Sequence, residues 1–164
     1  FNNQAEQKNV LLYTCCGFEP AGAQIKTDFS KLRRILNNLV GNAVKFTSSG
    51  SVSFGYKLKA KNLEFFVKDS GIGIRAEDHE TIFERFRQAG DHIHSIYGGN
   101  GLGLTIAKGY VEILGGKIWL ISEVGKGTTF CFTIPYIPEN FATSEEFKRP
   151  VKELIPFMRR EQKH

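Results

Sequence analysis

The spacing of apolar residues changes between residues 27–47 and residues 51–69, and this change limits the possible folds more than any other feature. From Leu32 to Ala43, apolar side chains recur at the three- and four-residue intervals of an amphipathic helix. In SVSFGYKLKA and LEFFVKD they recur at every second position, which is typical of strands with one buried and one wet face. The sequence therefore predicts a helix packed on a sheet.

The remaining segments complete a single α+β domain. Val10 to Cys16 reads as a short strand, a KN connection predicts a hairpin between the two alternating segments, and a second helix follows GGNGLGL and ends near Leu114. KIWLIS and GTTFCFTIPY predict two closing strands around VGKG. We expect a two-layer α/β sandwich with a mixed, mostly antiparallel sheet and helices on one face.

Length and composition fit one domain over residues 1–138. The chain has 164 residues, enough for a sizeable core. Residues 139–164 are charged and broken by Pro150 and Pro156, and we interpret them as a C-terminal extension or linker.

The net charge of +5 is interspersed with acids. A phosphate ligand or a phosphorylated partner would account for it, and so would a solvated basic surface; no nucleic-acid partner is expected.

Cys15, Cys16 and Cys131 form neither a disulfide framework nor a CxxC pattern, which predicts a reducing, cytoplasmic location for the domain. No apolar run approaches the ~20 residues of a membrane span. The chain begins at FNNQAEQ without methionine, so we expect an excised domain whose inner-membrane anchor, if the full-length protein has one, lies outside it.

One polar stripe on the first long predicted helix contains candidate functional side chains. At ~100° per residue, Lys31, Arg34, Asn38, Asn42 and Lys45 lie on one side of the apolar face. Lys31 and Arg34 fit a solvated face equally well. The two asparagines fit it less well, because Glu, Lys or Gln would cost less helix propensity. An asparagine amide can ligate a hard cation through oxygen or donate to a phosphate.

The segment DSGIG follows the second strand of the hairpin. Asp69 is in phase with Leu63 and Val67, so its carboxylate should face the buried side and need a partner. An exocyclic amino group of a ligand is one candidate, and the backbone of its own glycine turn is the alternative. Gly71 and Gly73 would let the chain turn sharply and leave room for a flat ring.

GGNGLGL opens the second helix, where free backbone N–H groups and the positive helix end suit an anion. Its GxGxG spacing differs from the GxGxxG of dinucleotide folds, and it lacks the lysine of a P-loop. A flexible loop of equal length is the alternative.

The combination of these motifs resembles the catalytic, ATP-binding domain of sensor histidine kinases. This domain belongs to a superfamily with DNA gyrase, mismatch-repair and heat-shock-chaperone ATPases and has a Bergerat-type fold. NLVGNAVKFT looks like the N box, DSGIGI the first glycine box, FERFRQ the phenylalanine box and GGNGLGL the second glycine box. GKGTTFCFTIP is similar to the closing strand pair, and the resemblance runs in family order from about Val10 to Pro138.

The resemblance implies ATP and Mg²⁺ as ligands and assigns roles to individual residues. Asn42 would ligate Mg²⁺, with Asn38 and Lys45 acting on the phosphates as the catalytic pair. Asp69 would accept a hydrogen bond from the adenine amino group, and Thr128 would help through a water. The implied nucleotide-binding set is Asn42, Lys45, Phe46, Asp69, Gly71, Gly73, Ile74, Gly99, Gly101, Leu102, Gly103, Leu104 and Thr128.

The resemblance also implies a mobile ATP lid over about residues 75–100, pinned by Phe83 and Phe86. Many family members carry an arginine where this chain has Gln88. Two nearby side chains could supply that charge instead: Arg85 and Arg87.

The hydrolytic branch of the superfamily has a glutamate where this chain has Asn38, and an amide is no general base. This favours donation of the γ-phosphate to a histidine in two-component signalling. None of His79, His92, His94 and His164 lies in the family's acceptor motif, so we expect the acceptor on a helical dimerisation domain N-terminal to Phe1, with a response regulator receiver domain as further partner. The alternatives are a nucleotide-binding pseudokinase sensor, an anti-sigma-type serine kinase and, with less support, a superfamily ATPase.

Overall fold

The computed structural model describes residues 1–16, 25–84 and 102–136. Within these ranges no helix has the length and apolar character needed to cross a membrane. The elements in chain order are α1 (Asn2–Gln7), β1 (Val10–Cys16), α2 (Phe29–Phe46), β2 (Gly50–Lys59), β3 (Asn62–Asp69), the short 3-10 turns η1 (Ala76–Asp78) and η2 (Thr81–Phe83), α4 (Gly103–Ile113), β4 (Ile118–Glu123) and β5 (Gly127–Pro135).

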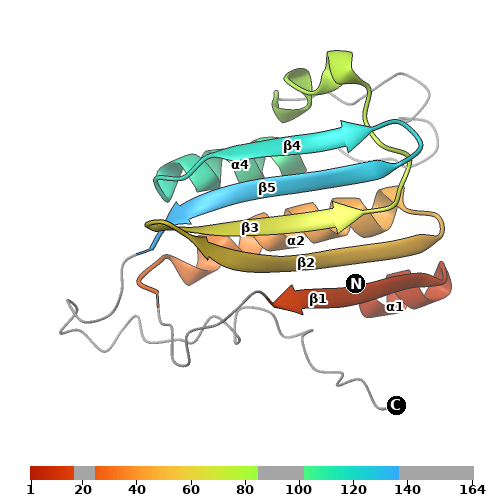
Figure 1. Cartoon of the computed structure of the whole chain (residues 1–164), viewed down its shortest axis with the longest axis horizontal. Helices are drawn as coiled ribbons and strands as arrows, with labels where there is room; N and C mark the ends of the chain where they lie inside the picture. The colour runs from red at the N-terminus through yellow and green to blue at the C-terminus, as the bar shows by residue number, and fades with distance from the viewer. Residues whose placement is uncertain (17–24, 85–101, 137–164) are drawn as a thin grey trace.

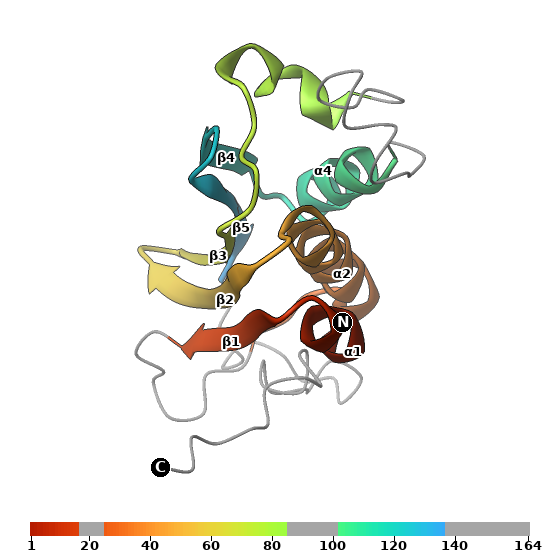
Figure 2. The same ribbon diagram turned by 90° about the vertical axis from the view of Figure 1, so that its right-hand side faces the viewer.

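The strands form one five-stranded sheet in the order β1-β2-β3-β5-β4. β1 pairs with β2 in parallel, and the three other pairings are antiparallel. Figures 1 and 2 show α1, α2 and α4 together on one face of this sheet. The predicted two-layer α/β sandwich with a mixed, mostly antiparallel sheet is therefore confirmed.

α2 has the predicted bounds and the predicted orientation. Its N-cap is Asp28, whose carboxylate accepts a hydrogen bond from the backbone N–H of Lys31 at 3.0 Å and also pairs with the Lys31 ammonium. The helix turns its apolar stripe onto the sheet, and seven side chains are buried there: Leu32, Ile35, Leu36, Leu39, Val40, Ala43 and Val44.

The core lies between α2 and the central strands. The strand register places Val67 opposite Phe130 and Phe65 opposite Phe132, all on the inward face. The rings of Phe65 and Phe132 stack with centroids 4.8 Å apart and planes 5° apart. Burying such rings contributes roughly 2–3 kcal/mol each. The inward faces of β3 and β5 are therefore well packed in the core.

The predicted pattern of β2 is wrong in two respects. Leu58, expected on the buried face, is 44% exposed, whereas Ser53 and Gly55 on the supposedly wet face are buried. β2 lies between β1 and β3, and a Cβ at Gly55 would stand 1.9 Å from the Cys15 carbonyl oxygen. The hairpin turn also lies one residue earlier than expected, because Lys59 pairs with Asn62 and Ala60 adopts φ +54°.

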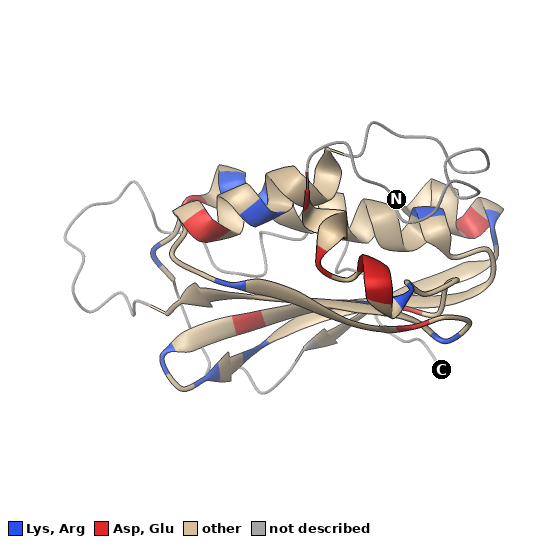
Figure 3. Cartoon of the chain, turned by 90° about the horizontal axis from the view of Figure 1, so that it is seen from above, with Lys and Arg blue, Asp and Glu red and all other residues tan. Residues whose placement is uncertain are grey.

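The charged residues of the described segments are distributed over both layers. Figure 3 shows lysine, arginine and acidic positions on helices, strands and turns, without one continuous basic block. This agrees with the interspersed charge expected from the sequence.

Candidate functional site

The polar stripe of α2 meets the beginning of α4. A Cβ at Gly103, the first residue of α4, would lie 3.7 Å from the Asn38 side-chain oxygen. The Asn38 amide nitrogen, Nδ2, is buried and has no hydrogen-bond partner among the described residues. An unsatisfied buried donor costs about 1–3 kcal/mol, so Asn38 offers a hydrogen bond that a bound anion could accept.

Asn42 lies one helical turn after Asn38 and is half-buried. Its amide makes no hydrogen bond to any part of the chain that the structure describes. Lys45 is half-buried on the same stripe, and its Nζ lies 5.2 Å from the centroid of the Phe46 ring. An amide oxygen and an ammonium group thus follow Asn38 along the helix.

Asp69 lies at the end of β3 and is buried, as its phase in the strand predicted. Its Oδ1 accepts hydrogen bonds from the backbone N–H of Gly71 at 2.8 Å and of Thr128 at 3.2 Å. The bond to Gly71 is the local turn considered as the alternative, but it occupies only one oxygen. No donor among residues 1–16, 25–84 and 102–136 reaches Oδ2, which can accept a hydrogen bond from a ligand.

Burial raises the pKa of the Asp69 carboxyl above its ordinary value of 3.8, while the N–H groups of Gly71 and Thr128 act in the opposite direction. A partly desolvated carboxylate is a strong acceptor for a neutral donor such as an amino group.

A hydroxyl pair extends this site from β3 to β4 and β5. Ser122 Oγ accepts a hydrogen bond from the Ile74 N–H at 2.8 Å and donates to the Gly127 carbonyl at 3.0 Å. It lies 2.8 Å from Thr128 Oγ1. Either hydroxyl can donate in this contact, but only the arrangement in which Ser122 donates to Gly127 and Thr128 donates to Ser122 satisfies all three groups, and it leaves Thr128 its acceptor lone pairs. Sequence reasoning missed Ser122, although the alternation of KIWLIS with Ser122 on the inward face was a usable signal.

Glycine is required at position 73 because the backbone of β4 lies very close to the backbone of this loop. Gly73 has φ +72°, and a Cβ there would stand 2.1 Å from the Glu123 carbonyl oxygen. β4 therefore lies directly against the DSGIG loop, which accounts for this glycine by packing. Its expected second role, leaving room for a flat ring, stays a prediction.

The two halves of the site meet at the end of α2. The Ile72 N–H donates to the Phe46 carbonyl at 3.4 Å, so the loop after Asp69 rests on the last turn of the helix. From Asn38 to Phe46 the helix rises ~12 Å. At one end, the site thus has hydrogen-bond acceptors suited to an amino group. At the other end, along α2, it has side chains suited to binding an anion.

The structure describes only part of the predicted loop residues. Leu102, Gly103 and Leu104 lie at the start of α4, and Thr105 Oγ1 donates to the Phe83 carbonyl at 3.1 Å, which ties η2 to α4. Phe83 also packs against Phe130, with ring centroids 6.3 Å apart. Several predictions concern residues outside the described ranges: Gly99, Gly101, Phe86, Arg85, Arg87 and Gln88, most of the lid, and the extension at 139–164.

The described ranges contain no group of three or more His, Cys, Asp or Glu side chains suited to a metal ion. A hard divalent cation here would need amide, ligand and water oxygens, which is the donor set that Mg²⁺ accepts.

The motifs and the fold define a protein class. The family model described as "Histidine kinase-, DNA gyrase B-, and HSP90-like ATPase" matches residues 27–138. The chain belongs to this family, and the resemblance inferred from its sequence motifs is confirmed.

Within the family, the similarity is to sensor histidine kinases. The sensor histidine kinase AruS of Pseudomonas aeruginosa is 51% identical over 108 residues, which cover 63% of this chain and 11% of AruS. The autoinducer 2 sensor kinase/phosphatase LuxQ of Vibrio vulnificus is 45% identical over 122 residues, covering 71% of this chain and 14% of LuxQ. The crystal structure of full-length ShkA in complex with AMPPNP matches with a TM-score of 0.74 and 31% identity, over 83% of this chain and 27% of ShkA. The chain thus spans only a small part of each relative.

Proposed function

We propose that this chain binds Mg²⁺–ATP and donates the γ-phosphate to a histidine on a separate helical dimerisation domain. The observation that carries the proposal is Asp69: a buried carboxylate with Oδ1 fixed by two backbone N–H groups and Oδ2 left for a ligand donor. The Thr128 hydroxyl, on the residue whose backbone N–H binds this carboxylate, offers a second acceptor when it donates to Ser122. Two acceptors favour the amino group of adenine and disfavour guanine, which has an oxygen at that position.

The residues of α2 fit the phosphate end. Asn38 Nδ2 would donate to a phosphate oxygen, and Lys45 would neutralise phosphate charge. Asn42 would contribute its amide oxygen to Mg²⁺, whose chemistry when bound is to neutralise charge on the phosphate oxygens. Phosphoryl transfer needs mainly such positioning and charge neutralisation.

Donation to a protein acceptor is favoured over hydrolysis by Asn38. Its side chain stands beside the start of α4 but cannot take a proton from water. His79, the histidine that the described residues include, has Nε2 3.1 Å from the Ile74 carbonyl, at the base of the predicted lid. This supports an acceptor elsewhere, and we propose the dimerisation domain for it, with a receiver domain as the next partner.

Nucleotide binding tests the pocket through Asp69→Asn. Asparagine keeps an Oδ1 acceptor for both backbone N–H groups but presents N–H instead of oxygen to the amino group. We expect ATP and adenosine affinity, measured by calorimetry, to fall about 10- to 100-fold, since a hydrogen bond to a charged group contributes roughly 1.5–3 kcal/mol. Asp28→Asn, the same change at the N-cap of α2, should leave affinity unchanged because asparagine also caps well. Equal affinity of Asp69→Asn and the parent would refute the pocket assignment.

Phosphoryl transfer needs the chain with its preceding segment. With radiolabelled ATP, we expect an acid-labile phosphate on a histidine of that segment, and loss of the label in Asn42→Ala. Binding of ATP without any labelled histidine would instead support a nucleotide-sensing pseudokinase.

A further inference from the structure

The last turn of α2 is held by a side chain from α1. The Lys8 ammonium donates to the carbonyl of Val44 at 3.1 Å and to the carbonyl of Lys45 at 2.9 Å. The last four carbonyl groups of a helix have no partner within it, and a positive charge near them is favourable. Lys8 supplies both the donors and the charge, from the C-cap of α1.

The two other terminal carbonyls of α2 have partners from different elements. Thr47 Oγ1 donates to the Ala43 carbonyl at 2.7 Å, and the Ile72 N–H donates to the Phe46 carbonyl at 3.4 Å. The end of the helix is therefore fixed on one side by the loop after Asp69 and on the other by α1. Only the contact from α1 comes from outside the segment matched by the family model, residues 27–138.

α1 touches α2 at a second point, close to Asn42. A Cβ at Gly41 would lie 3.1 Å from the Phe1 ring, so the ring occupies the space beside this glycine. Ala5, between these contacts, is buried. Figure 2 shows α1 lying beside α2. The two contacts therefore lie on either side of Asn42 along the helix.

We propose that Lys8 is a positioning residue for the phosphate end of the nucleotide site. The proposal rests on the function proposed above, because it concerns how that same site is held. Lys8 binds the backbone of Lys45 itself and of its neighbour, and Asn42 precedes them by less than one turn. Without the ammonium, two half-buried carbonyls lose their partner, the last turn frays, and the Lys45 and Asn42 side chains lose their fixed position. The adenine end is held mainly by β3, β4 and β5 and meets α2 through the backbone bond from Ile72 to Phe46, so we expect it to depend less on Lys8.

The test compares a ligand that fills both ends with one that fills only the adenine end. In Lys8→Met we expect Mg²⁺–ATP affinity to fall about 5- to 20-fold, the range for loss of one positioning contact, while adenosine affinity stays within about twofold of the parent. A general loss of stability would weaken both ligands alike, so the ratio of the two affinities separates positioning from folding.

Two control variants sharpen the comparison. Lys8→Arg keeps a donating cation and should restore most of the ATP affinity. Lys68→Met removes an equal charge from an exposed position on β3 and should leave the ratio unchanged, which excludes a general effect of net charge. If Lys8→Met is poorly folded, Lys8→Gln is measured in its place; its shorter, uncharged side chain should also lower the ratio of ATP to adenosine affinity, because the charge at the helix end is lost.

The outcomes are distinct for the two proposals. If the parent binds ATP and adenosine but neither Lys8→Met nor Lys8→Gln changes their affinity ratio, Lys8 has no positioning role. If the parent binds neither ligand, the proposed function itself fails.

Discussion

At the residue scale, the hydroxyl of Ser122 determines what Thr128 can offer a ligand. In the arrangement that satisfies every group, Ser122 donates to the Gly127 carbonyl and accepts from the Ile74 N–H and from Thr128. Replacement by alanine would free the Thr128 proton, so that Thr128 could also donate. We therefore expect Ser122→Ala to reduce the preference for adenosine over guanosine about 3- to 10-fold, or roughly 0.7–1.4 kcal/mol, as measured by competition binding.

The matched control for this change is Ser122→Thr, which keeps a hydroxyl on an inward strand position. It should retain most of the adenosine preference. Ser122→Ala also leaves the Ile74 N–H and the Gly127 carbonyl without their partner, so a lower melting temperature is expected as well. An unchanged preference in spite of lower stability would mean that Ser122 acts only on folding.

The same residues show what sequence could predict at this scale. The burial of Asp69 followed from its phase with Leu63 and Val67, since side chains alternate strictly along a strand. Its partner Thr128 lies 59 positions away and meets it only because β5 pairs with β3. Strand order is a property of the whole sheet, so no local pattern could name this contact, although the alternation of KIWLIS could have marked Ser122 as an inward side chain.

At the scale of elements, Gly73 controls how closely the loop after β3 approaches β4. An alanine there combines φ +72° with a Cβ 2.1 Å from the Glu123 carbonyl oxygen. We expect Gly73→Ala to lower the free energy of unfolding by about 2 kcal/mol or more, as determined by urea denaturation, and to weaken nucleotide binding.

The chain provides a matched control in which the same substitution should act in the opposite direction. Gly109 lies inside α4, and a Cβ there meets nothing within 4 Å. Alanine is the better helix former, so Gly109→Ala should raise the free energy of unfolding by up to about 1 kcal/mol. An unchanged or raised free energy of unfolding in Gly73→Ala would contradict the close approach inferred at Gly73.

Elements with strong periodicity were predicted well, and α1 was not. α2 has the expected bounds because its apolar spacing and its N-cap Asp28 are local signals, and α4, whose N-cap Leu102 has no capping side chain, still ends near the expected Leu114. α1 has only six residues, NNQAEQ, without an apolar stripe, and a helix this short is unstable alone. Its stability comes from tertiary contacts such as Phe1 on Gly41 and Lys8 on the end of α2, which no sequence pattern reveals.

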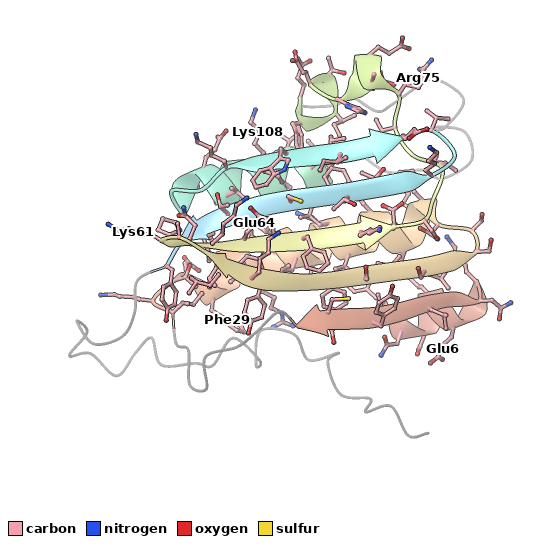
Figure 4. The ribbon with its side chains drawn as sticks, in the orientation of Figure 1. Glu6, Phe29, Lys61, Glu64, Arg75 and Lys108 are labelled. Carbon is pink, nitrogen blue, oxygen red and sulfur yellow. The ribbon has the colours of Figure 1, made fainter. Side chains whose placement is uncertain are left out.

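At the scale of the whole molecule, two carboxyl groups give stability opposite dependences on pH. Glu64 is buried on β3, where a hydrogen bond from Lys57, aided by Lys59, holds its pKa below the ordinary 4.5 in spite of burial. Figure 4 labels this side chain on the sheet. Asp69 is the reverse case, because burial raises its pKa above 3.8. A lowered pKa adds stability that is present at neutral pH and is lost on acidification; a raised pKa reduces stability at neutral pH.

The free energies of unfolding of variants that remove each charge should therefore converge on that of the parent as the pH falls, one from below and one from above. At neutral pH, Glu64→Gln should unfold more easily than the parent, because the Lys57 and Lys59 ion pairs at 2.9 and 3.1 Å are lost. Asp69→Asn should be at least as stable as the parent, because no desolvated charge remains. The deficit of Glu64→Gln should disappear as the pH falls below 4.5, through the lowered pKa of Glu64. Any excess stability of Asp69→Asn should disappear as the pH falls through the raised pKa of Asp69 toward 3.8. Urea titrations across this pH range measure both differences, and a Glu64→Gln deficit that persists at the acid end would show that Glu64 stabilises the fold by packing and not by charge.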